Sequence, residues 1–476
     1  MKDWSCKLEV VTPMFLAGAD QSCSELRPPS FKALMRWWYR AAKADLTPEE
    51  GLLFGTTDQA SRFRLRLTPD RIIRSTFERA NFQSKQDQDN QGLLYLGFSL
   101  DAKSQGGQRK RSSIDPGSTF CLELSLPHSQ SAAERSLLAS LWLLIWLGGV
   151  GSRSRRGFGS LCFTDADPLN EAGLPPKEKR LQLRFQGNFQ HLPDFLQENL
   201  RVAIDWIGSA QTGNTLPAFT TLGRHNSRLF LWKKPFPTWE GALDNAGKML
   251  MDYRRRKHDY EQIKKFLLDP SYSPTAVERA AFGLPILFYF TSVERQKLPS
   301  LIEKKFTRQG KSISRDEAER IASIRNSQQR KQKLLGKGLK REDVESLLRQ
   351  ARSLSTATIT GGRIEGGGSG NIKSYHERRA SPLLIKVIKV NDREYGLLFL
   401  LMKSQILEQG EQILIESKSR PPVLVNQPSF RTVIPAQPET QTLNVTPREA
   451  ADSLTWRTNP EIFRDGSVST NNAAII

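Results

Sequence analysis

The spacing of apolar residues in the first 165 positions predicts a mixture of strands and helices. Residues 7–11 are expected to form a short strand, and Pro28-Pro29 is expected to precede a helix with Ser30 as its N-cap. The strict alternation Arg-Phe-Arg-Leu-Arg-Leu at residues 62–67 predicts a half-buried strand. The remaining elements expected in this region are strands at residues 93–100, 119–126 and 160–164, and an apolar helix at residues 132–147.

The order of these elements is β-α-β-β-α-β, which is the order of a ferredoxin-like split βαβ unit. The expected fold class is therefore α+β. Two polar excursions interrupt the pattern, at residues 68–90 and 101–116. The second carries Gly-Gly-Gln-Arg-Lys-Arg at residues 106–111, which is either a solvated loop tip or a nucleic-acid contact.

A second region begins near Leu181, after a linker rich in proline and lysine. Its expected helices lie at residues 188–207 and 239–266, and its expected strands lie at residues 181–185, 282–290, 382–390 and 395–406. A highly charged helical insertion is expected at about residues 304–350, and a glycine-rich loop at 361–370. The polar residues 423–476 are expected to form an extended or disordered tail.

The net charge of the chain indicates what kind of partner the protein binds. The formal net charge is +20 and the sequence pI is about 9.9. Such a surplus indicates a polyanionic partner, because lysine and arginine displace condensed counterions from phosphates. An acidic membrane surface is the competing interpretation, but no apolar run reaches the roughly 18 residues needed to span a bilayer. The start of the sequence has no signal-peptide pattern, so a cytoplasmic location is expected.

The cysteines and histidines do not indicate a metal site or a cofactor. Cys6, Cys23, Cys121 and Cys162 are scattered without a CxxC motif, and they are expected to be reduced core thiols. The five histidines occur singly. We therefore expect no cofactor and no structural zinc.

Basic residues recur along one face of the first expected helix. Lys32, Arg36 and Arg40 fall at i, i+4 and i+8, and Arg27 precedes the helix. The stripe is either a solvated face or a nucleic-acid contact. Trp37 and Trp38 are expected to be core residues rather than base-stacking platforms, with Trp37 the less certain of the two.

The segment at residues 148–159, called the glycine loop below, is the stronger signal. Its glycines are Gly148, Gly149, Gly151, Gly157 and Gly159. Glycines allow positive φ and close approach to a phosphate, and successive amides in such a turn can form an anion-binding concavity. Arg153, Arg155 and Arg156 add planar donors suited to phosphate. The loop follows a helix and precedes a strand, and this order excludes the Walker A and dinucleotide-binding motifs.

Catalysis has little support in the sequence. A metal-free ribonuclease usually needs a positioned general base, most often histidine. No Ser/His/Asp or His/Lys grouping is visible, and only His225 and His376 lie in glycine- or arginine-bearing segments. The paired carboxylates Glu49 and Glu50 are expected to be solvated.

The stretch Glu-Leu-Arg-Pro-Pro-Ser-Phe-Lys-Ala-Leu-Met-Arg-Trp-Trp-Tyr-Arg at residues 25–40 resembles a known family. It is similar to the first-helix motif of the RAMP superfamily of CRISPR proteins, in the form typical of the first subunit of the type III-B Cmr effector complex. The segment 12–18, Leu-Phe-Gly at 53–55 and the glycine loop fit the same family. Ala-Phe-Gly-Leu-Pro at 281–285 and Arg-Arg-Ala-Ser-Pro-Leu at 378–383 resemble its second half.

This resemblance implies two ferredoxin-like, RRM-like RAMP domains with polar insertions. The first would span residues 1–170 and include the glycine loop, and the second would span 180–422. The implied role is a non-catalytic subunit near the 3′ side of the CRISPR RNA that helps to capture target RNA in antiviral defence. The implied partners are CRISPR RNA, target RNA and other RAMP subunits of the Cmr complex. The RNA contacts carried over by position are Arg27, Lys32, Arg36, Arg40, Arg153, Arg155, Arg156, Arg378 and Arg379.

Two other functions stay open at this point. Some RAMP relatives are endoribonucleases that process CRISPR RNA with a histidine near the first helix, whereas this chain has no histidine before His128. A stand-alone RAMP endoribonuclease is the alternative, and a general nucleic-acid chaperone is a third possibility.

Overall fold

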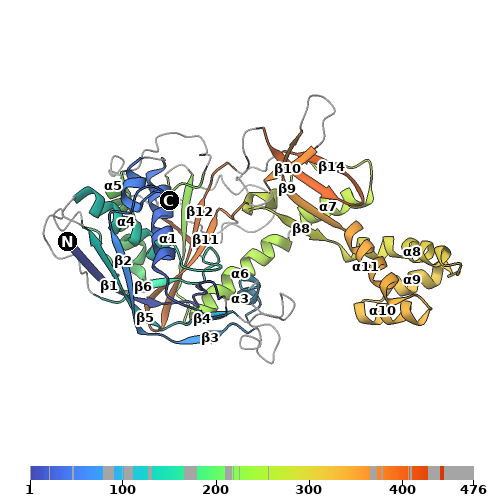
Figure 1. Cartoon of the computed structure of the whole chain (residues 1–476), viewed down its shortest axis with the longest axis horizontal. Helices are drawn as coiled ribbons and strands as arrows, with labels where there is room; N and C mark the ends of the chain where they lie inside the picture. Colours follow the sequence, from blue (N-terminus) through green and yellow to red (C-terminus); the bar gives the residue numbers. More distant parts are fainter. Residues whose placement is uncertain are drawn as a thin grey trace. The chain divides into compact units, whose positions relative to one another are not determined.

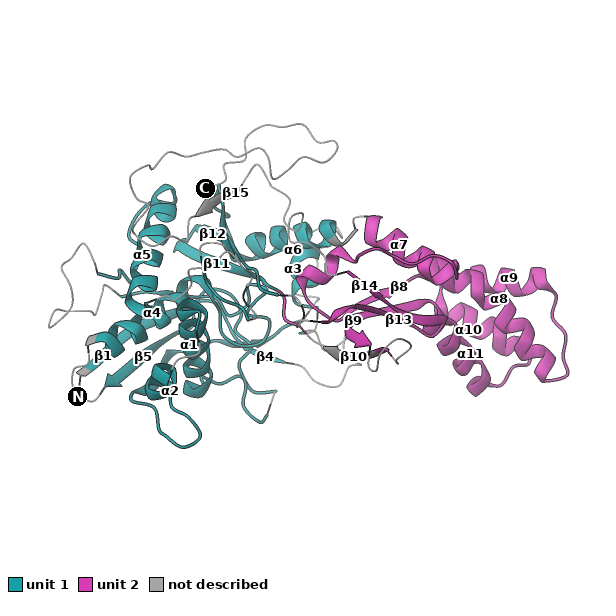
Figure 2. Ribbon diagram, turned by 90° about the horizontal axis from the view of Figure 1, so that it is seen from above, with its two compact units in different colours: residues 1–253, 382–405, 434–476 teal, residues 254–381, 406–433 magenta. Residues whose placement is uncertain are grey.

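The computed structural model of the chain is shown in Figure 1. It describes residues 2–20, 22–45, 48–78, 90–98, 100, 111–126, 131–165, 180–208, 217, 219–223, 226–255, 257–364, 372–376, 379–405, 407, 410–426 and 440–443. The chain divides into two compact units. Unit 1 comprises residues 1–253, 382–405 and 434–476, and unit 2 comprises residues 254–381 and 406–433 (Figure 2). The fold is α+β, and its named strands pair in antiparallel sheets.

The first sheet of unit 1 has the strand order β2-β5-β1-β6, and its neighbours are antiparallel. Its elements are β1 (Lys2–Val10), α1 (Pro28–Lys43), β2 (Arg64–Arg71), β5 (Thr119–Leu126), α4 (Ser131–Leu147) and β6 (Leu161–Phe163). Side chains of β5 alternate between half-buried and buried. The buried Phe120 meets Phe31 of α1 edge to face, with ring centroids 5.7 Å apart. The expected β-α-β-β-α-β order is therefore present in this region.

The second sheet of unit 1 repeats this strand order. It is formed by β7 (Ser227–Trp232), β11 (Leu383–Asn391), β12 (Glu394–Met402) and β15 (Thr440–Leu443). Its order β11-β12-β7-β15 places its second, third, first and fourth strands side by side, as in the first sheet. The chain leaves this sheet twice to build unit 2, first between α6 (Trp239–Arg255) and β11, and again between β12 and β15.

Unit 2 combines a five-stranded sheet with helices. Its strands are β8 (Ile286–Tyr289), β9 (Thr356–Ile364), β10 (Ile372–His376), β13 (Gln412–Ser417) and β14 (Arg420–Val425), and its helices are α7 (Lys257–Leu268), α8 (Thr291–Arg308), α9 (Arg315–Ser323), α10 (Ser327–Gly336) and α11 (Arg341–Leu354). Strand β9 pairs with β8, β10 and β13. The charged insertion expected at 304–350 is helical, and α8–α11 enclose a hydrophobic core of their own.

The two compact units do not follow the expected boundaries, because unit 1 contains both the sheet expected in residues 1–170 and strands expected in the second domain. The domains 1–170 and 180–422 stay a prediction. The expected tail from residue 423 includes the end of β14 and all of β15, which pairs with β7. The start of the expected loop at 361–370 belongs to β9, and residues 365–370 lie outside the described part.

Two expected strands are wrong. Residues 93–100 are not a strand, because helix α3 (Gln91–Leu96) lies there, and the carboxylate of Asp244 accepts the amides of Gly92 and Leu93 at its first turn. Residues 181–185 pair with no strand in the part of the chain that the structure describes. Their carbonyls instead accept indole N–H groups of α4, from Trp142 at 3.0 Å and from Trp146 at 2.8 Å.

The remaining expectations from the second region hold in part. Residues 188–207 form a 3₁₀ turn (Phe189–His191) followed by α5 (Leu192–Ile207), as expected. The long helix expected at 239–266 is described as α6 and α7, with residue 256 outside the described part. Only the end of 282–290 is a strand, β8. Helix α2 (Pro48–Phe54) and the β3–β4 ribbon (Arg74–Thr76 with Ser112–Ile114) complete unit 1.

All four cysteines are free thiols, but only Cys6 is buried and Cys23 is exposed, so the expectation of core thiols holds for Cys6 alone. Burial raises the pKa of the Cys6 thiol to about 12. Among the described residues, no helix combines the length and apolar character required to cross a bilayer.

Candidate nucleic-acid interface

Helix α1 begins and ends for identifiable reasons. Its N-cap is Arg27, and Pro28 and Pro29 occupy the first helical positions, where a missing amide hydrogen costs nothing. Ser30 lies inside the first turn, so the expected Ser30 cap is wrong. Ala44 ends the helix in the left-handed region at φ 59°, and its amide donates to the Arg40 carbonyl.

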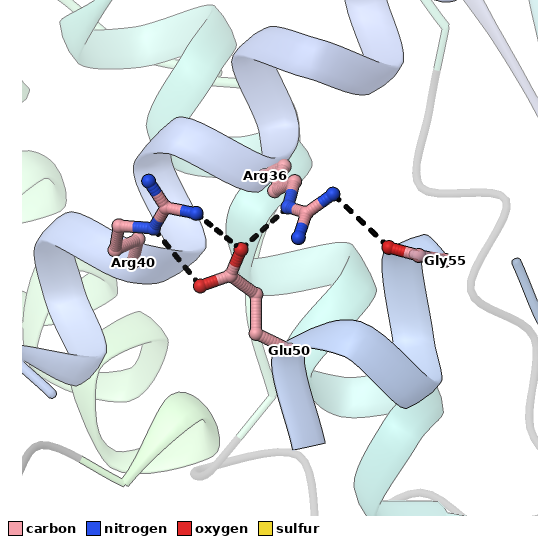
Figure 3. Close-up of polar contacts among 4 residues, drawn as sticks. All are labelled: Arg36, Arg40, Glu50 and Gly55. Atoms are coloured by element: carbon pink, nitrogen blue, oxygen red, sulfur yellow. Dashed lines mark hydrogen bonds and ion pairs between the residues drawn. The ribbon is translucent and has the colours of Figure 1, made fainter. Parts of the chain in front are cut away.

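The expected basic stripe of α1 is present but is not free. Arg36 and Arg40 both bind the carboxylate of Glu50, which α2 supplies (Figure 3). Arg36 Nε donates to Oε1 at 2.5 Å, and Arg40 donates from Nε to Oε2 at 2.9 Å and from Nη2 to Oε1 at 2.6 Å. Arg36 also donates to the Gly55 carbonyl at 3.0 Å. Two of the three basic side chains therefore hold α2 against α1.

The carboxylate of Glu50 is buried although its two arginine partners are partly exposed. The Glu50 side chain is 5% exposed, whereas those of Arg36 and Arg40 are 35% and 41% exposed. Burial acts to raise the pKa of Glu50, but the hydrogen bonds from Arg40 and Arg36 outweigh it and lower the pKa below its ordinary value. The expectation that Glu50 is solvated is wrong, although its neighbour Glu49 is 64% exposed as expected.

Lys32 and Arg27 have different surroundings. The ammonium of Lys32 lies 5.6 Å from the centroid of the Phe63 ring, and partial burial followed by repulsion from Arg36 lowers the Lys32 pKa. Arg27 donates to the Ala17 carbonyl at 3.0 Å and pairs with Glu25 at 3.5 Å. Lys32 is thus the member of the stripe that has no carboxylate partner among the described residues.

The glycine loop owes its glycines to backbone geometry. Gly151, Gly157 and Gly159 have φ values of 92°, 86° and 65°, the region that glycine alone adopts freely. A Cβ at Gly159 would lie 1.8 Å from the Val150 carbonyl oxygen, and one at Gly151 would lie 2.5 Å from that of Phe15. The predicted positive φ is confirmed at these three positions, and close contacts within the protein are sufficient to require glycine there.

Several amides of the loop already have acceptors. Val150 donates to Gly159, Ser152 donates to Phe15 at 2.8 Å, and Gly159 donates to Pro13 at 2.9 Å. The Thr12 hydroxyl donates to the Gly157 carbonyl at 2.7 Å. These amides cannot bind a phosphate without breaking their present hydrogen bonds. Fewer amides of the loop are therefore available to bind an anion than the sequence suggested.

The glycine loop also joins the two sheets of unit 1. Ile385 of β11 donates its amide to the Arg155 carbonyl at 3.1 Å, and Val387 donates to the Ser160 hydroxyl at 3.3 Å. Between them, the buried amine of Lys386 donates to the Leu161 carbonyl at 3.0 Å. Burial lowers the pKa of Lys386 to about 7. The loop and the residues that follow it are therefore held to β11 by backbone and side-chain hydrogen bonds.

Two tryptophans connect α1 to the glycine loop. Trp38 is buried, and its indole nitrogen would lie 2.6 Å from a Cβ at Gly148. Trp37 is half-buried, and the guanidinium of Arg155 lies over its ring at 5.3 Å from the centroid. Burial lowers the pKa of Arg155, but a guanidinium keeps its charge at neutral pH. The helix and the loop, expected from sequence to act together, are thus joined.

Comparisons with known proteins agree with this arrangement. The family model described as "RAMP superfamily" matches residues 7–162, which include α1 and the glycine loop. The Pyrococcus furiosus protein "CRISPR system Cmr subunit Cmr1-1" is 31% identical over 271 residues, which are 55% of this chain and 70% of the relative. A second protein of that organism, "CRISPR system Cmr subunit Cmr1-2", is 33% identical over 32% of this chain and 91% of its own length.

The chain belongs to the Cmr1 family of the RAMP superfamily. It is accordingly a Cmr subunit of a CRISPR system. Among solved structures, the crystal structure of Cmr1 from Pyrococcus furiosus in its apo form is similar with a TM-score of 0.48 and 18% identity, covering 89% of this chain and 94% of that one.

The other predicted contacts of this Cmr1-family chain are dispersed. Arg153 has a φ of 62° and accepts the Arg156 amide at its carbonyl, so these two residues form a tight turn of the glycine loop. Arg379 lies in unit 2, where its backbone exchanges two hydrogen bonds with Leu284. Arg378 lies outside the described residues, as do the side chain of His376 and all of His225.

A polar hollow lies beside the glycine loop. It has a volume of about 350 Å³ and is lined by residues 15–18, Arg111, Ser112, Gly151 and Ser152. Arg111 donates to the Ser152 hydroxyl at 3.5 Å. Arg111 ends the run at residues 106–111 in the second polar excursion, and its contact with the glycine loop could not be predicted because it spans 41 residues. The contact of Thr12 with Gly157 was missed for the same reason, since it spans 145 residues.

Proposed function

We propose that this chain is a non-catalytic RNA-binding subunit of a type III-B CRISPR effector complex. In this role it lies near the 3′ side of the CRISPR RNA and helps to capture target RNA, with CRISPR RNA, target RNA and other RAMP subunits as its partners. The observation that supports this most directly is the position of Arg155 over Trp37. It joins the glycine loop to α1, so that the two basic elements are in direct contact within unit 1.

We further propose that the two sheets of unit 1 are two ferredoxin-like domains. Both have the strand order in which the second, third, first and fourth strands lie side by side, with antiparallel neighbours. In the second domain unit 2 is inserted before and after the pair β11–β12. The chain would thus carry two copies of one architecture, and a four-stranded sheet of this kind binds single-stranded RNA in RRM domains.

The RNA-binding role predicts that Lys32→Gln combined with Arg155→Gln weakens binding to single-stranded RNA. Each lost phosphate contact should lower the slope of log affinity against log salt by about 0.7, so the slope should fall by about 1.4. Fluorescence anisotropy of a labelled RNA across a salt series measures both quantities. Arg36 and Arg40 are unsuitable targets, because replacing them would also release Glu50.

The matched control replaces Arg64 and Arg66, which are exposed on β2, with glutamine. It removes the same charge from another part of unit 1. Equal losses of affinity in the two double variants would contradict the proposed interface, since they would show only a dependence on net charge.

The non-catalytic role predicts that the purified chain leaves CRISPR repeat RNA intact in the absence of metal. Gel analysis of end-labelled repeat RNA after incubation measures this. Site-specific cleavage that His225→Ala or His376→Ala abolishes would instead establish the RAMP endoribonuclease activity.

A further inference from the structure

Unit 2 carries a helical bundle, α8–α11, with a strong positive charge. Residues 291–354 contain 17 lysines and arginines and 8 aspartates and glutamates. The bundle is a folded module, because its core includes Leu298, Ile302, Phe306, Leu334 and Leu347, each at most 3% exposed. The excess charge is therefore displayed on a defined surface. Nothing in the proposed role of unit 1 makes use of it.

Most of the carboxylates of the bundle are engaged within it. Glu294 pairs with Arg330 at 2.5 Å, with both side chains about 95% buried. Asp343 pairs with Lys305 at 2.6 Å, and Glu345 pairs with Lys331 at 2.7 Å. The other ion pairs of the bundle join Glu303 and Glu319 to Arg315, Glu317 to Lys337, and Glu345 to Arg341. These pairs neutralise acidic charge and leave the unpaired basic side chains to set the surface potential.

One stretch of the bundle carries basic residues and no acidic ones. Residues 320–341 contain eight lysines and arginines and no aspartate or glutamate. Arg320, Arg325 and Lys333 are exposed, and none of them makes an ion pair or a side-chain hydrogen bond with a described residue. Exposed glutamines at 328, 329 and 332 lie among them and add neutral donors. Helix α10 and the turn before it thus contain cations and amides but no carboxylate of their own, and the carboxylates that reach α10 from other helices pair with Arg330 and Lys331.

Arg330 keeps this stretch in place. Its guanidinium donates to Glu294 of α8 and, from Nε and Nη2, to the Ile324 carbonyl at 3.2 and 2.7 Å. Asn326 caps α10 by accepting the amides of Gln328 and Gln329. The turn that carries Arg325 is therefore fixed to the bundle before any ligand binds, which lowers the entropic cost of binding.

The same surface lacks what a protein partner or a membrane would use. Protein interfaces bury aromatic and large aliphatic side chains at their centre, and interfacial helices insert an apolar face. The large apolar side chains that are exposed in the described part of the chain all lie outside residues 291–354. The only aromatic residue of the bundle, Phe306, is 3% exposed. Charge and hydrogen bonding are what this surface offers.

We infer that α9, α10 and the turn between them form a second RNA-binding surface, which holds the phosphate backbone of an RNA strand without reading its sequence. Phosphate contacts from lysine and arginine provide this kind of affinity, and they need neither an apolar anchor nor a pocket. The surface adds a contact in unit 2 to the interface proposed in unit 1. It rests on different residues and can fail independently of that interface.

The test is the full-length variant Arg320→Gln/Arg325→Gln/Lys333→Gln. We expect its affinity for a labelled single-stranded RNA of arbitrary sequence to fall about 5- to 20-fold at moderate salt, and the slope of log affinity against log salt to fall by about 2, or about 0.7 for each of three contacts. The three side chains make no contacts that hold the fold together, so thermal unfolding followed by circular dichroism should not change.

The matched control, Lys304→Gln/Arg308→Gln/Arg349→Gln, removes the same charge from exposed positions of α8 and α11. A much smaller loss of affinity is expected. Equal losses in the two triple variants would overturn the assignment to α9 and α10. Unchanged binding in the first variant, together with weakened binding in Lys32→Gln/Arg155→Gln, would overturn this inference and leave the proposed function of unit 1 standing.

Discussion

At the scale of single residues, Glu50 decides what the basic stripe of α1 can do. The Glu50 side chain is only 5% exposed, and it accepts hydrogen bonds from Arg36 and Arg40, which lie on one face of α1. The cost of burying this carboxylate is offset only while both partners remain. Arg36 and Arg40 therefore stabilise the packing of α2 on α1. An RNA phosphate could bind only to those N–H groups of the two arginines that Glu50 does not occupy.

Replacing Glu50 should expose this dependence. We expect Glu50→Gln to lower the free energy of unfolding by about 1–3 kcal/mol at neutral pH, because charge-assisted hydrogen bonds are lost. The pKa of Glu50 is lowered in the folded protein. Its stabilisation is thus fully present above the ordinary carboxyl pKa and disappears as the pH falls through the lowered value. Urea unfolding at several pH values between neutral and acidic measures the difference.

Glu49→Gln is the control, since Glu49 is 64% exposed and its contact with Lys43 is 3.6 Å long. A change of less than about 0.5 kcal/mol is expected. A difference between wild type and Glu50→Gln that stays constant down to acidic pH would contradict the account given for Glu50.

Burial and backbone conformation of single residues could be predicted only where they depend on neighbouring positions in the sequence. The buried Trp38, the less buried Trp37 and the positive φ of the loop glycines follow from helix spacing and from the properties of glycine. The Glu50 partnership could not be predicted, because a carboxylate looks the same in sequence whether it is solvated or enclosed. Its contacts depend on how α2 packs against α1.

At the scale of elements, the glycine loop is a rigid connector between two sheets. Its amides and carbonyls bind Pro13 and Phe15 in one segment of the chain and Ile385 in another. A loop held in this way presents Arg155 in one place instead of sampling many. Pre-ordering of this kind favours recognition of an extended backbone.

The loop glycines should differ sharply from other glycines with positive φ. We expect Gly159→Ala to cost at least about 3 kcal/mol, because a Cβ would add a backbone clash to the strain of a left-handed residue. Gly310 has a φ of 68° and nothing within 4 Å of a Cβ. Gly310→Ala should therefore cost only about 1 kcal/mol. Chemical denaturation of both variants measures the contrast, and similar costs would show that packing is not what requires Gly159.

Elements could be predicted where the apolar pattern is unambiguous. The strand at β5 and the helix at α4 follow from an alternating and a continuous apolar run. The error at residues 93–100 arose because a short apolar run fits either element. Asp244, about 150 residues away, caps the first turn and favours the helix.

At the scale of the whole molecule, the bundle α8–α11 is attached to unit 2 at one place. The Phe290 amide donates to the Ser355 carbonyl at 3.1 Å, so the two ends of residues 291–354 meet. Lys297 adds hydrogen bonds at 3.0 Å to the carbonyls of Leu267 and Leu354. The charged insertion is therefore a helical module whose two ends lie close together where it joins the rest of unit 2.

Replacing residues 291–354 with a short Gly-Ser linker should leave a chain that still unfolds cooperatively. A cost of about 1–2 kcal/mol is expected, since the Lys297 bonds are lost while the Phe290–Ser355 contact remains. Circular dichroism should show less helix and a retained thermal transition. The control carries the same linker inserted after Gly310, and loss of the transition in the excised chain alone would contradict the narrow attachment.

The nesting of unit 2 within the second sheet could not be predicted, because strand pairing across a long insertion leaves no trace in local patterns. Residue charge marked the bundle, but nothing local marks β7 as the partner of β12.

That pairing has a consequence for biosynthesis. The strands of the first sheet all lie within residues 2–163, so this sheet can close early as the nascent chain emerges. Strand β7 cannot pair with β12 until much later, because Leu398 of β12, which lies opposite Leu231 of β7, follows it by more than 160 residues. For that interval the ribosome carries a chain with an apolar strand whose two edges are unpaired, and chaperones have their clearest opportunity to act there.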